Sequence, residues 1–236
     1  GSMGAAFSII ENNHIFNIWT KRQFEGAEIG GIKFHAAVDA IIRNNRIHDC
    51  GRGLWLDWMT QGTRVSSNLF YNNDLEDIFL EVNHGPFIVD NNIFLSESAI
   101  KTQSEGGAFV HNLIAGTVHN WSEPNRFTPY FLPHSTDMAG LTTIYGGDDR
   151  YYNNLFIGPG DKKVKEKEKF SLKGYENTKL PVWIDGNIYC NGATASEKDA
   201  NFIDSPSYNP GLVLTEEDGH GYLKLTYERS FLEHNV

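Results

Sequence analysis

An asparagine recurs at a fixed place in a short pattern that appears seven times along this chain. In each copy a pair of residues ends in asparagine, and the second residue after the pair is large and apolar. Successive asparagines are 32, 23, 24, 20, 42 and 33 residues apart. Such spacing indicates a structural repeat of roughly 20 to 24 residues with insertions in some turns, and we expect the interval of 42 to hold two repeats. The seven asparagines are Asn13, Asn45, Asn68, Asn92, Asn112, Asn154 and Asn187.

The repeat favours a parallel β-helix. Asparagine tolerates the left-handed backbone conformation of a sharp corner, and its amide can bond to the copies above and below. Between the asparagines lie short runs with strand-like alternation, such as Leu54–Trp58, Ile78–Val82 and Phe87–Val89. Short strands at this period are typical of an all-β solenoid, here a parallel β-helix with long loop insertions. A leucine-rich-repeat solenoid is the competing fold, but its leucine spacing is absent.

We expect one solenoid domain over residues 4–204. Residues 1–3 resemble the remnant of an expression tag. Residues 119–150 are interpreted as a loop-rich excursion, and the charged residues 160–181 as a solvated loop. Residues 205–236 are expected to cap the open end, because terminal repeats need a polar outer face.

The net charge of −10 narrows the range of partners. It argues against nucleic acid and anionic membrane surfaces, and weakly against polyanionic polysaccharides, so we expect a neutral ligand. No apolar run is long enough to span a membrane and no signal-peptide pattern is present, which favours a cytoplasmic location. The two cysteines indicate neither a disulfide framework nor a metal site, and oligomerisation is left open.

Two acids occupy the same position in consecutive repeats. Asp57 and Glu81 each lie 11 residues before the asparagine that follows them in the pattern. Equal offsets place the two acids one above the other, and the alternation of their strands turns both away from the core. The same offset predicts Lys101 on the next rung, where it would favour ionised carboxylates.

The spacing of these acids points to a glycosidase. Neighbouring strands lie roughly 4.7–4.9 Å apart. Retaining glycosidases hold their two carboxyl groups roughly 5–5.5 Å apart, whereas inverting enzymes need roughly 6.5–9.5 Å. Carboxyl groups this close do not both ionise easily, so one keeps its proton. The aromatic neighbours Trp55, Trp58 and Phe79 could stack on sugar rings, although a solvated pair of surface acids is the alternative.

Two strings of residues are distinctive. Gly53–Met59 reads Gly-Leu-Trp-Leu-Asp-Trp-Met, and Phe79–Pro86 reads Phe-Leu-Glu-Val-Asn-His-Gly-Pro. Further matches lie in Thr128–Tyr130, Pro133–Thr136 and Gly146–Arg150. With these residues the chain resembles glycoside hydrolase family 120, the β-xylosidases with a right-handed β-helix core.

The resemblance implies specific roles. Asp57 would be the nucleophile, Glu81 the general acid/base, and Glu28 a substrate-binding residue. The implied activity is retaining hydrolysis of xylo-oligosaccharides from the non-reducing end, without a metal or an organic cofactor. Family members are longer, with further rungs and an inserted β-sandwich that supplies part of the sugar-binding wall. The chain would then be a C-terminal part, and an inactive fragment is one expectation.

Other residues are weaker candidates. His84 and His134 could bond sugar hydroxyls, with ordinary hydrogen-bonded loop histidines as an equal alternative. His35 lies near the register of Asp57 on the preceding rung and could contact substrate. Asp149 and Arg150 are expected to form a salt bridge that supports the wall of the site.

Two further function classes fit a β-helix, because fold alone does not choose the chemistry. A polysaccharide lyase would need a basic groove and usually calcium, and the acidic charge speaks against it. A non-catalytic carbohydrate-binding solenoid would bind sugar without turnover.

Overall fold

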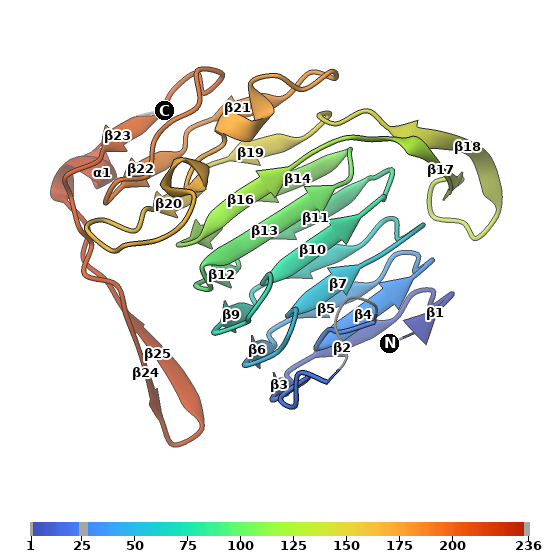
Figure 1. The fold of residues 1–236 in the computed structure, drawn as a ribbon, viewed down its shortest axis with the longest axis horizontal. Helices are drawn as coiled ribbons and strands as arrows, with labels where there is room; N and C mark the ends of the chain where they lie inside the picture. The colour runs from blue at the N-terminus through green and yellow to red at the C-terminus, as the bar shows by residue number, and fades with distance from the viewer. Residues whose placement is uncertain (1, 24–27, 234–236) are drawn as a thin grey trace.

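Three sheets of short parallel strands form the body of the protein, and Figure 1 shows them stacked along one axis. The structure is a computed structural model that describes residues 2–23 and 28–233. Each turn of the chain contributes one strand to each sheet, so every strand pairs with the strand one rung away. This is the parallel β-helix that the repeat predicts.

The first sheet contains the strands β1 (Ser2–Met3), β4 (Ile32–His35), β7 (Leu54–Leu56), β10 (Ile78–Glu81), β13 (Ser98–Gln103) and β16 (Thr117–Asn120). The second contains β2 (Ile9–Glu11), β5 (Ile41–Arg43), β8 (Arg64–Ser66), β11 (Phe87–Asp90), β14 (Gly107–Val110), β19 (Arg150–Tyr152) and β21 (Trp183–Asp185). The third contains β3 (His14–Phe16), β6 (Arg46–His48), β9 (Leu69–Tyr71), β12 (Ile93–Phe94), β15 (Leu113–Ile114), β20 (Leu155–Ile157), β22 (Ile188–Cys190) and β23 (Ile203–Ser205). Ser2 and Met3, assigned above to a tag, therefore extend the first sheet.

The repeated asparagines form a ladder along the corner between the second and third sheets. Each side-chain amide nitrogen donates to the Oδ1 of the next asparagine at 3.0–3.1 Å. The left-handed backbone conformation belongs to the residue before each of these asparagines, for example Ser67 (φ 55°) and His111 (φ 55°). The ladder asparagine itself is thus retained for its amide, which bonds both neighbouring rungs.

Apolar side chains fill the space inside the three sheets. The alternating leucines and isoleucines of β7 and β10 point inward and are at most 1% exposed. Aromatic rings continue the core as stacks that cross rungs, such as Phe70 on Phe94 and Phe156 on Tyr189, with ring centroids 5.1 and 5.0 Å apart. This burial leaves the polar and aromatic residues at the alternate positions for the outer faces.

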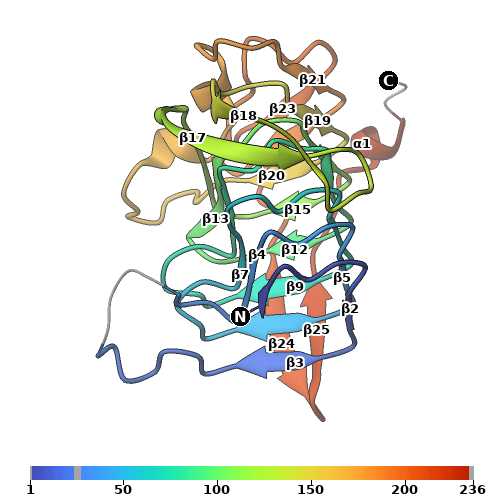
Figure 2. The same ribbon diagram turned by 90° about the vertical axis from the view of Figure 1, so that its right-hand side faces the viewer.

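The interval of 42 residues is a single rung with an insertion, so the expectation of two repeats is wrong. Asn112 bonds directly to Asn154, and β15 pairs with β20. The insertion is an antiparallel hairpin of β17 (Glu123–Phe131) and β18 (Met138–Ile144), which we call the lateral hairpin. Figures 1 and 2 show it lying across the ends of the parallel strands. The excursion is therefore strand structure over most of its length.

The second insertion is only partly solvated. Residues 165–169 are exposed, and the chain then forms the 3-10 helices η1 (Lys167–Lys169) and η2 (Lys173–Tyr175). Phe170, Leu172 and Tyr175 are buried in this segment. The prediction of a solvated loop is wrong for these three residues, because their side chains close the core beyond β16.

The C-terminal segment lies along the side of the solenoid. The hairpin of β24 (Val213–Glu217) and β25 (His220–Lys224) contacts the third sheet through Glu216, which accepts a hydrogen bond from Tyr71 at 2.8 Å. The helix α1 (Arg229–Glu233) follows it. Among the described residues there is no helix with the length and apolar character needed to cross a membrane.

Candidate active site

Asp57 and Glu81 occupy equivalent positions on adjacent rungs. Leu56 pairs with Leu80 in the parallel register of β7 and β10, and each acid directly follows one of these leucines. Both acids point away from the core, because the preceding leucines point into it. Their exposure differs: the side chain of Asp57 is 7% exposed and that of Glu81 is 17% exposed.

Lys101 does not stand beside the acids, so that prediction is wrong. Gln103 pairs with Glu81, whereas Lys101 pairs with Phe79. The reason is the length of the turn that follows each strand: residues 104–106 connect β13 to β14, two fewer than residues 82–86 between β10 and β11. Counting back from the asparagine therefore shifts the register by two residues.

The carboxylate of Asp57 is held on both of its oxygens. Oδ2 lies 2.9 Å from Lys33 Nζ and 3.4 Å from His35 Nε2. Oδ1 accepts a hydrogen bond of 2.7 Å from the backbone N–H of Trp58. Lys33 is 3% exposed, and its Nζ also lies 3.2 Å from the centroid of the Trp55 ring. A buried ammonium in contact with Asp57 stabilises the ionised carboxylate.

Glu28 joins the same group from the loop that precedes β4. Its Oε1 lies 3.0 Å from Lys33 Nζ and its Oε2 lies 3.3 Å from His35 Nε2. The hydrogen bond from Lys33 is the largest influence on the pKa of Glu28, which is lowered although burial acts in the opposite direction. The side chain is 65% exposed, so Glu28 can meet a ligand from solvent while Lys33 anchors it.

Oxygen and nitrogen atoms of Glu28, His35 and Asp57 lie within 4.8 Å of one another, a spacing that could hold a metal ion. Lys33 Nζ, however, already binds a carboxylate oxygen of both acids. A divalent cation would have to displace this ammonium. The donor set therefore fits an internal ion-pair cluster better than a metal centre.

Glu81 is held by two donors of different origin. Trp55 Nε1 donates to Oε2 at 3.0 Å, and Arg126 Nη1 lies 2.8 Å from Oε1. Arg126 comes from the lateral hairpin and its side chain is 46% exposed. With both donors in place Glu81 acts as an ionised acceptor, so it can give up a proton only after one donor has moved.

The aromatic residues of the prediction have other contacts here. Trp55 is 6% exposed, and Arg52 Cζ lies 4.5 Å from its ring centroid in addition to the Lys33 ammonium. Its indole thus orients Glu81 and contacts cations. Trp58 is half-buried and packs against Val38, Met59 and Phe131, a residue of the lateral hairpin.

His84 and His134 hold the lateral hairpin rather than the carboxylates. His84 Nε2 lies 2.5 Å from Thr128 Oγ1, and its side chain is buried. His134 Nδ1 lies 2.9 Å from Asp39 Oδ2 and its side chain is exposed. Both contacts tie the hairpin to turns between the first and second sheets.

Asp149 and Arg150 do not form the expected salt bridge. Arg150 Nη1 instead lies 2.8 Å from Asp148 Oδ1. Asp149 is buried and accepts a hydrogen bond of 2.9 Å from the backbone N–H of Gly107. Consecutive strand residues point to opposite faces, which is why Asp149 turns toward the core and Arg150 toward solvent.

Sequence reasoning missed Lys33 and Arg126. For Lys33 a usable pattern exists, since it pairs with Trp55 and therefore shares its outward face. Arg126 lies 45 residues from Glu81 on an element without a repeat, and no pattern in the sequence connects the two.

Comparison with known proteins agrees with this architecture. Residues 1–122 match the family described as the right handed beta helix region. Curated proteins show no match. A solved structure described as the complex structure of XylC with xylose is similar to this chain, with 46% sequence identity and a TM-score of 0.82. The similarity covers 92% of this chain and 37% of that one, so this chain spans little more than a third of the length of XylC. The chain belongs to the right-handed β-helix family.

Proposed function

We propose that this chain holds the catalytic centre of a retaining β-xylosidase of glycoside hydrolase family 120, which releases xylose from xylo-oligosaccharides. The proposal rests on one observation, the equivalent placement of Asp57 and Glu81 on adjacent rungs. Strands one rung apart bring the two carboxyl groups close to the separation used by retaining enzymes. The similarity to a xylose complex of XylC supports a xylose-containing substrate.

In the first step, the Asp57 carboxylate attacks the anomeric carbon of the terminal sugar. The glycosidic bond breaks as Glu81 transfers its proton to the leaving oxygen. Since Arg126 binds Glu81 in the free protein, we expect substrate to displace this arginine before the proton is transferred. The product of this step is an ester between Asp57 and the sugar, together with the shortened oligosaccharide.

In the second step, Glu81 takes a proton from water and the water oxygen attacks the anomeric carbon. The bond to Asp57 breaks and xylose leaves. Lys33 lies where it stabilises the negative charge that returns to Asp57 Oδ2. Glu28 and His35 lie beside the nucleophile and are proposed to accept hydrogen bonds from sugar hydroxyls.

A second candidate is a sugar-binding protein without catalysis. The ion pair between Arg126 and Glu81 favours it, because an acid that keeps this partner has no proton to give. The two functions differ in turnover, since a binding protein would retain xylo-oligosaccharides unchanged.

The test is hydrolysis of an aryl β-xyloside by this chain and by the natural protein that contains it. Asp57→Ala should abolish turnover, and added azide should restore it with formation of a glycosyl azide. Glu97→Ala, an exposed acid on a different turn, is the control and should keep full activity. Unchanged turnover in Asp57→Ala would remove this residue from the mechanism.

A further inference from the structure

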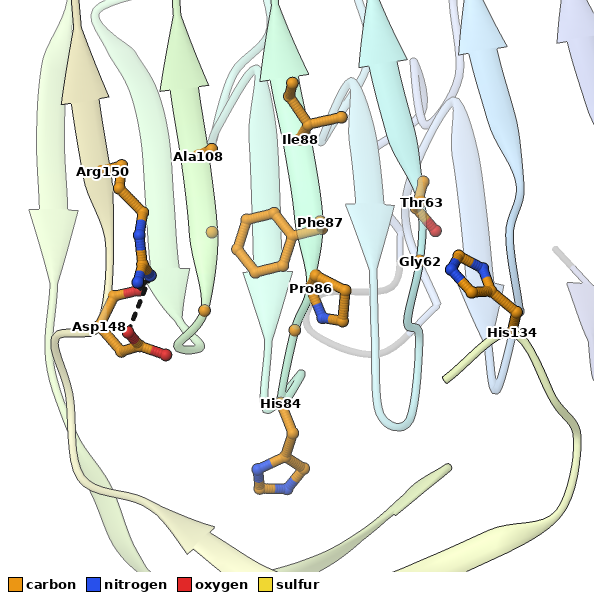
Figure 3. A pocket seen from close by; sticks show the side chains of 13 residues that line it. Gly62, Thr63, His84, Pro86, Phe87, Ile88, Ala108, His134, Asp148 and Arg150 are labelled. Carbon is orange, nitrogen blue, oxygen red and sulfur yellow. Dashed lines mark hydrogen bonds and ion pairs between the residues drawn. The ribbon is translucent and has the colours of Figure 1, made fainter. Parts of the chain in front are cut away.

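A hollow of about 690 Å³ opens on the outer face of the second sheet, beside the lateral hairpin. We call it the second-sheet hollow. This volume lies within the range of roughly 300–1,000 Å³ typical of small-molecule sites. Its floor is apolar, with Pro86, Phe87, Ile88 and Ala108, and Figure 3 shows these residues between His134 on one side and Arg150 on the other.

The hollow exists because small residues follow one another on adjacent rungs. Ile88, Ala108, Arg150 and Trp183 share one register on four neighbouring strands, and Ala108 has the smallest side chain among them. Gly107, beside it, has no Cβ, which would lie 2.4 Å from the Phe87 ring. The missing side chains thus leave a trough that runs along the solenoid axis.

The charged groups at the two rims are neutralised in pairs. Arg150 binds Asp148, and its guanidinium carbon lies 4.2 Å from the ring centroid of Trp183, which is 42% exposed. At the opposite rim His134 binds Asp39. An anion or a cation would gain little from such a balanced rim. Hydroxyl groups can bond to these polar side chains, while the apolar floor and the exposed indole suit the faces of sugar rings.

The lateral hairpin separates this hollow from the carboxylates. Arg126 contacts Glu81 and Thr128 contacts His84, both on the turn between the first and second sheets. Phe131 exchanges two backbone hydrogen bonds with the Gln61 side chain on the next turn, at 3.0 and 3.1 Å. Asp57 and Glu81 lie on the first-sheet side of these contacts and do not line the hollow.

We infer that the second-sheet hollow is a separate binding site for a neutral oligosaccharide, laid along the solenoid axis between His134 and Trp183. The proposed function supplies only the class of sugar, a xylo-oligosaccharide. Such a site would keep the protein attached to a longer chain while the carboxylate centre acts on a free end.

The experiment measures binding of xylohexaose by calorimetry in an Asp57→Ala background, which prevents turnover. Ala108→Trp fills the trough and should weaken binding about tenfold, a loss typical of a blocked contact surface. Ala108→Ser leaves the trough open and should bind as the parent does. Trp183→Ala removes a rim contact without filling the hollow, so it decides the question if Ala108→Trp fails to fold.

Hydrolysis of an aryl β-xyloside, measured with Asp57 intact, separates the two proposals. Ala108→Trp should leave this turnover unchanged, because the small substrate needs only the carboxylate centre. Loss of xylohexaose binding in a protein that hydrolyses no xyloside would retain the hollow as a sugar site and reject the proposed function. Equal affinity for xylohexaose in Ala108→Trp and in Ala108→Ser, or no binding by the parent, overturns the inference.

Discussion

Lys33 and Asp57 form a buried ion pair between adjacent rungs, with 2.9 Å between Nζ and Oδ2 and side chains that are 3% and 7% exposed. Taking two charges out of water is costly, and their attraction offsets this cost only while both are present. Lys33 also binds Glu28. One lysine therefore compensates the proposed nucleophile and orders a proposed substrate ligand.

Replacing Lys33 by methionine should lower the free energy of unfolding by roughly 3–5 kcal/mol, because Asp57 is left as an uncompensated buried charge. Urea denaturation measures this loss. The control is the same replacement in an Asp57→Asn background, where the remaining amide is neutral and the cost should be much smaller. Equal losses in the two backgrounds would show that Lys33 acts through packing alone.

Replacing Glu81 by glutamine should reduce turnover by about 10²–10⁴-fold on substrates with poor leaving groups, the range typical of a lost general acid. Glutamine can still accept the hydrogen bond from Trp55, so the site geometry should persist. The first step on a dinitrophenyl β-xyloside should be nearly unaffected, because that leaving group needs no proton. A uniform loss on both substrates would instead indicate a structural role for Glu81.

The ladder and the neighbouring acids could be predicted because they depend on local periodicity. Asn68 and Asn92 follow turns of matching length, so an offset of 11 placed Asp57 and Glu81 correctly. The method failed where a turn changed length. Counting 11 back from Asn45 gives Phe34, a core residue, whereas the residue level with Asp57 is His35. A shift of one residue reverses the face of the strand.

The contacts of the lateral hairpin could not be predicted in this way. Antiparallel strands outside the solenoid do not share its repeat, and Arg126 meets Glu81 only through the path of the hairpin in space. Burial was hidden for a related reason. Asp57 faces outward as the alternation predicts, yet the lysine of one rung and the backbone of Trp58 cover it.

Replacing Asn92 by alanine should destabilise the protein by roughly 3 kcal/mol or more, since each buried polar group left unpaired costs about 1–3 kcal/mol. Its Oδ1 accepts two hydrogen bonds from Asn68, and its amide donates to Val65, Asp90 and Asn112. Thermal and urea unfolding measure the loss. Asn13→Ala, at the exposed end of the ladder, is the matched control and should cost far less. Similar losses at the two positions would contradict a role for burial.

Asp149 is the group most expected to make stability depend on pH. Burial raises its pKa from the ordinary value of 3.8 to about 8, and hydrogen bonds from Gly107 and Tyr175 oppose this shift only in part. Below pH 3.8 the folded and unfolded chains are both protonated at this residue. Between the two values the unfolded chain loses its proton first, so stability falls as pH rises. Above about pH 8 both states are ionised and the decline ends.

Replacing Asp149 by asparagine should therefore flatten the pH profile of stability. The amide mimics the protonated acid: its oxygen can accept from Gly107 and its nitrogen can donate to the Tyr175 hydroxyl. The parent should lose up to about 1.4 kcal/mol per pH unit through this group between pH 4 and 8, and the variant should lack that part of the slope. Urea denaturation at several pH values measures both slopes, with Asp148→Asn as the control, because that acid is exposed and paired with Arg150. Parallel profiles for the parent and Asp149→Asn would mean that Asp149 is ionised in the folded protein, held by its hydrogen bonds despite its burial.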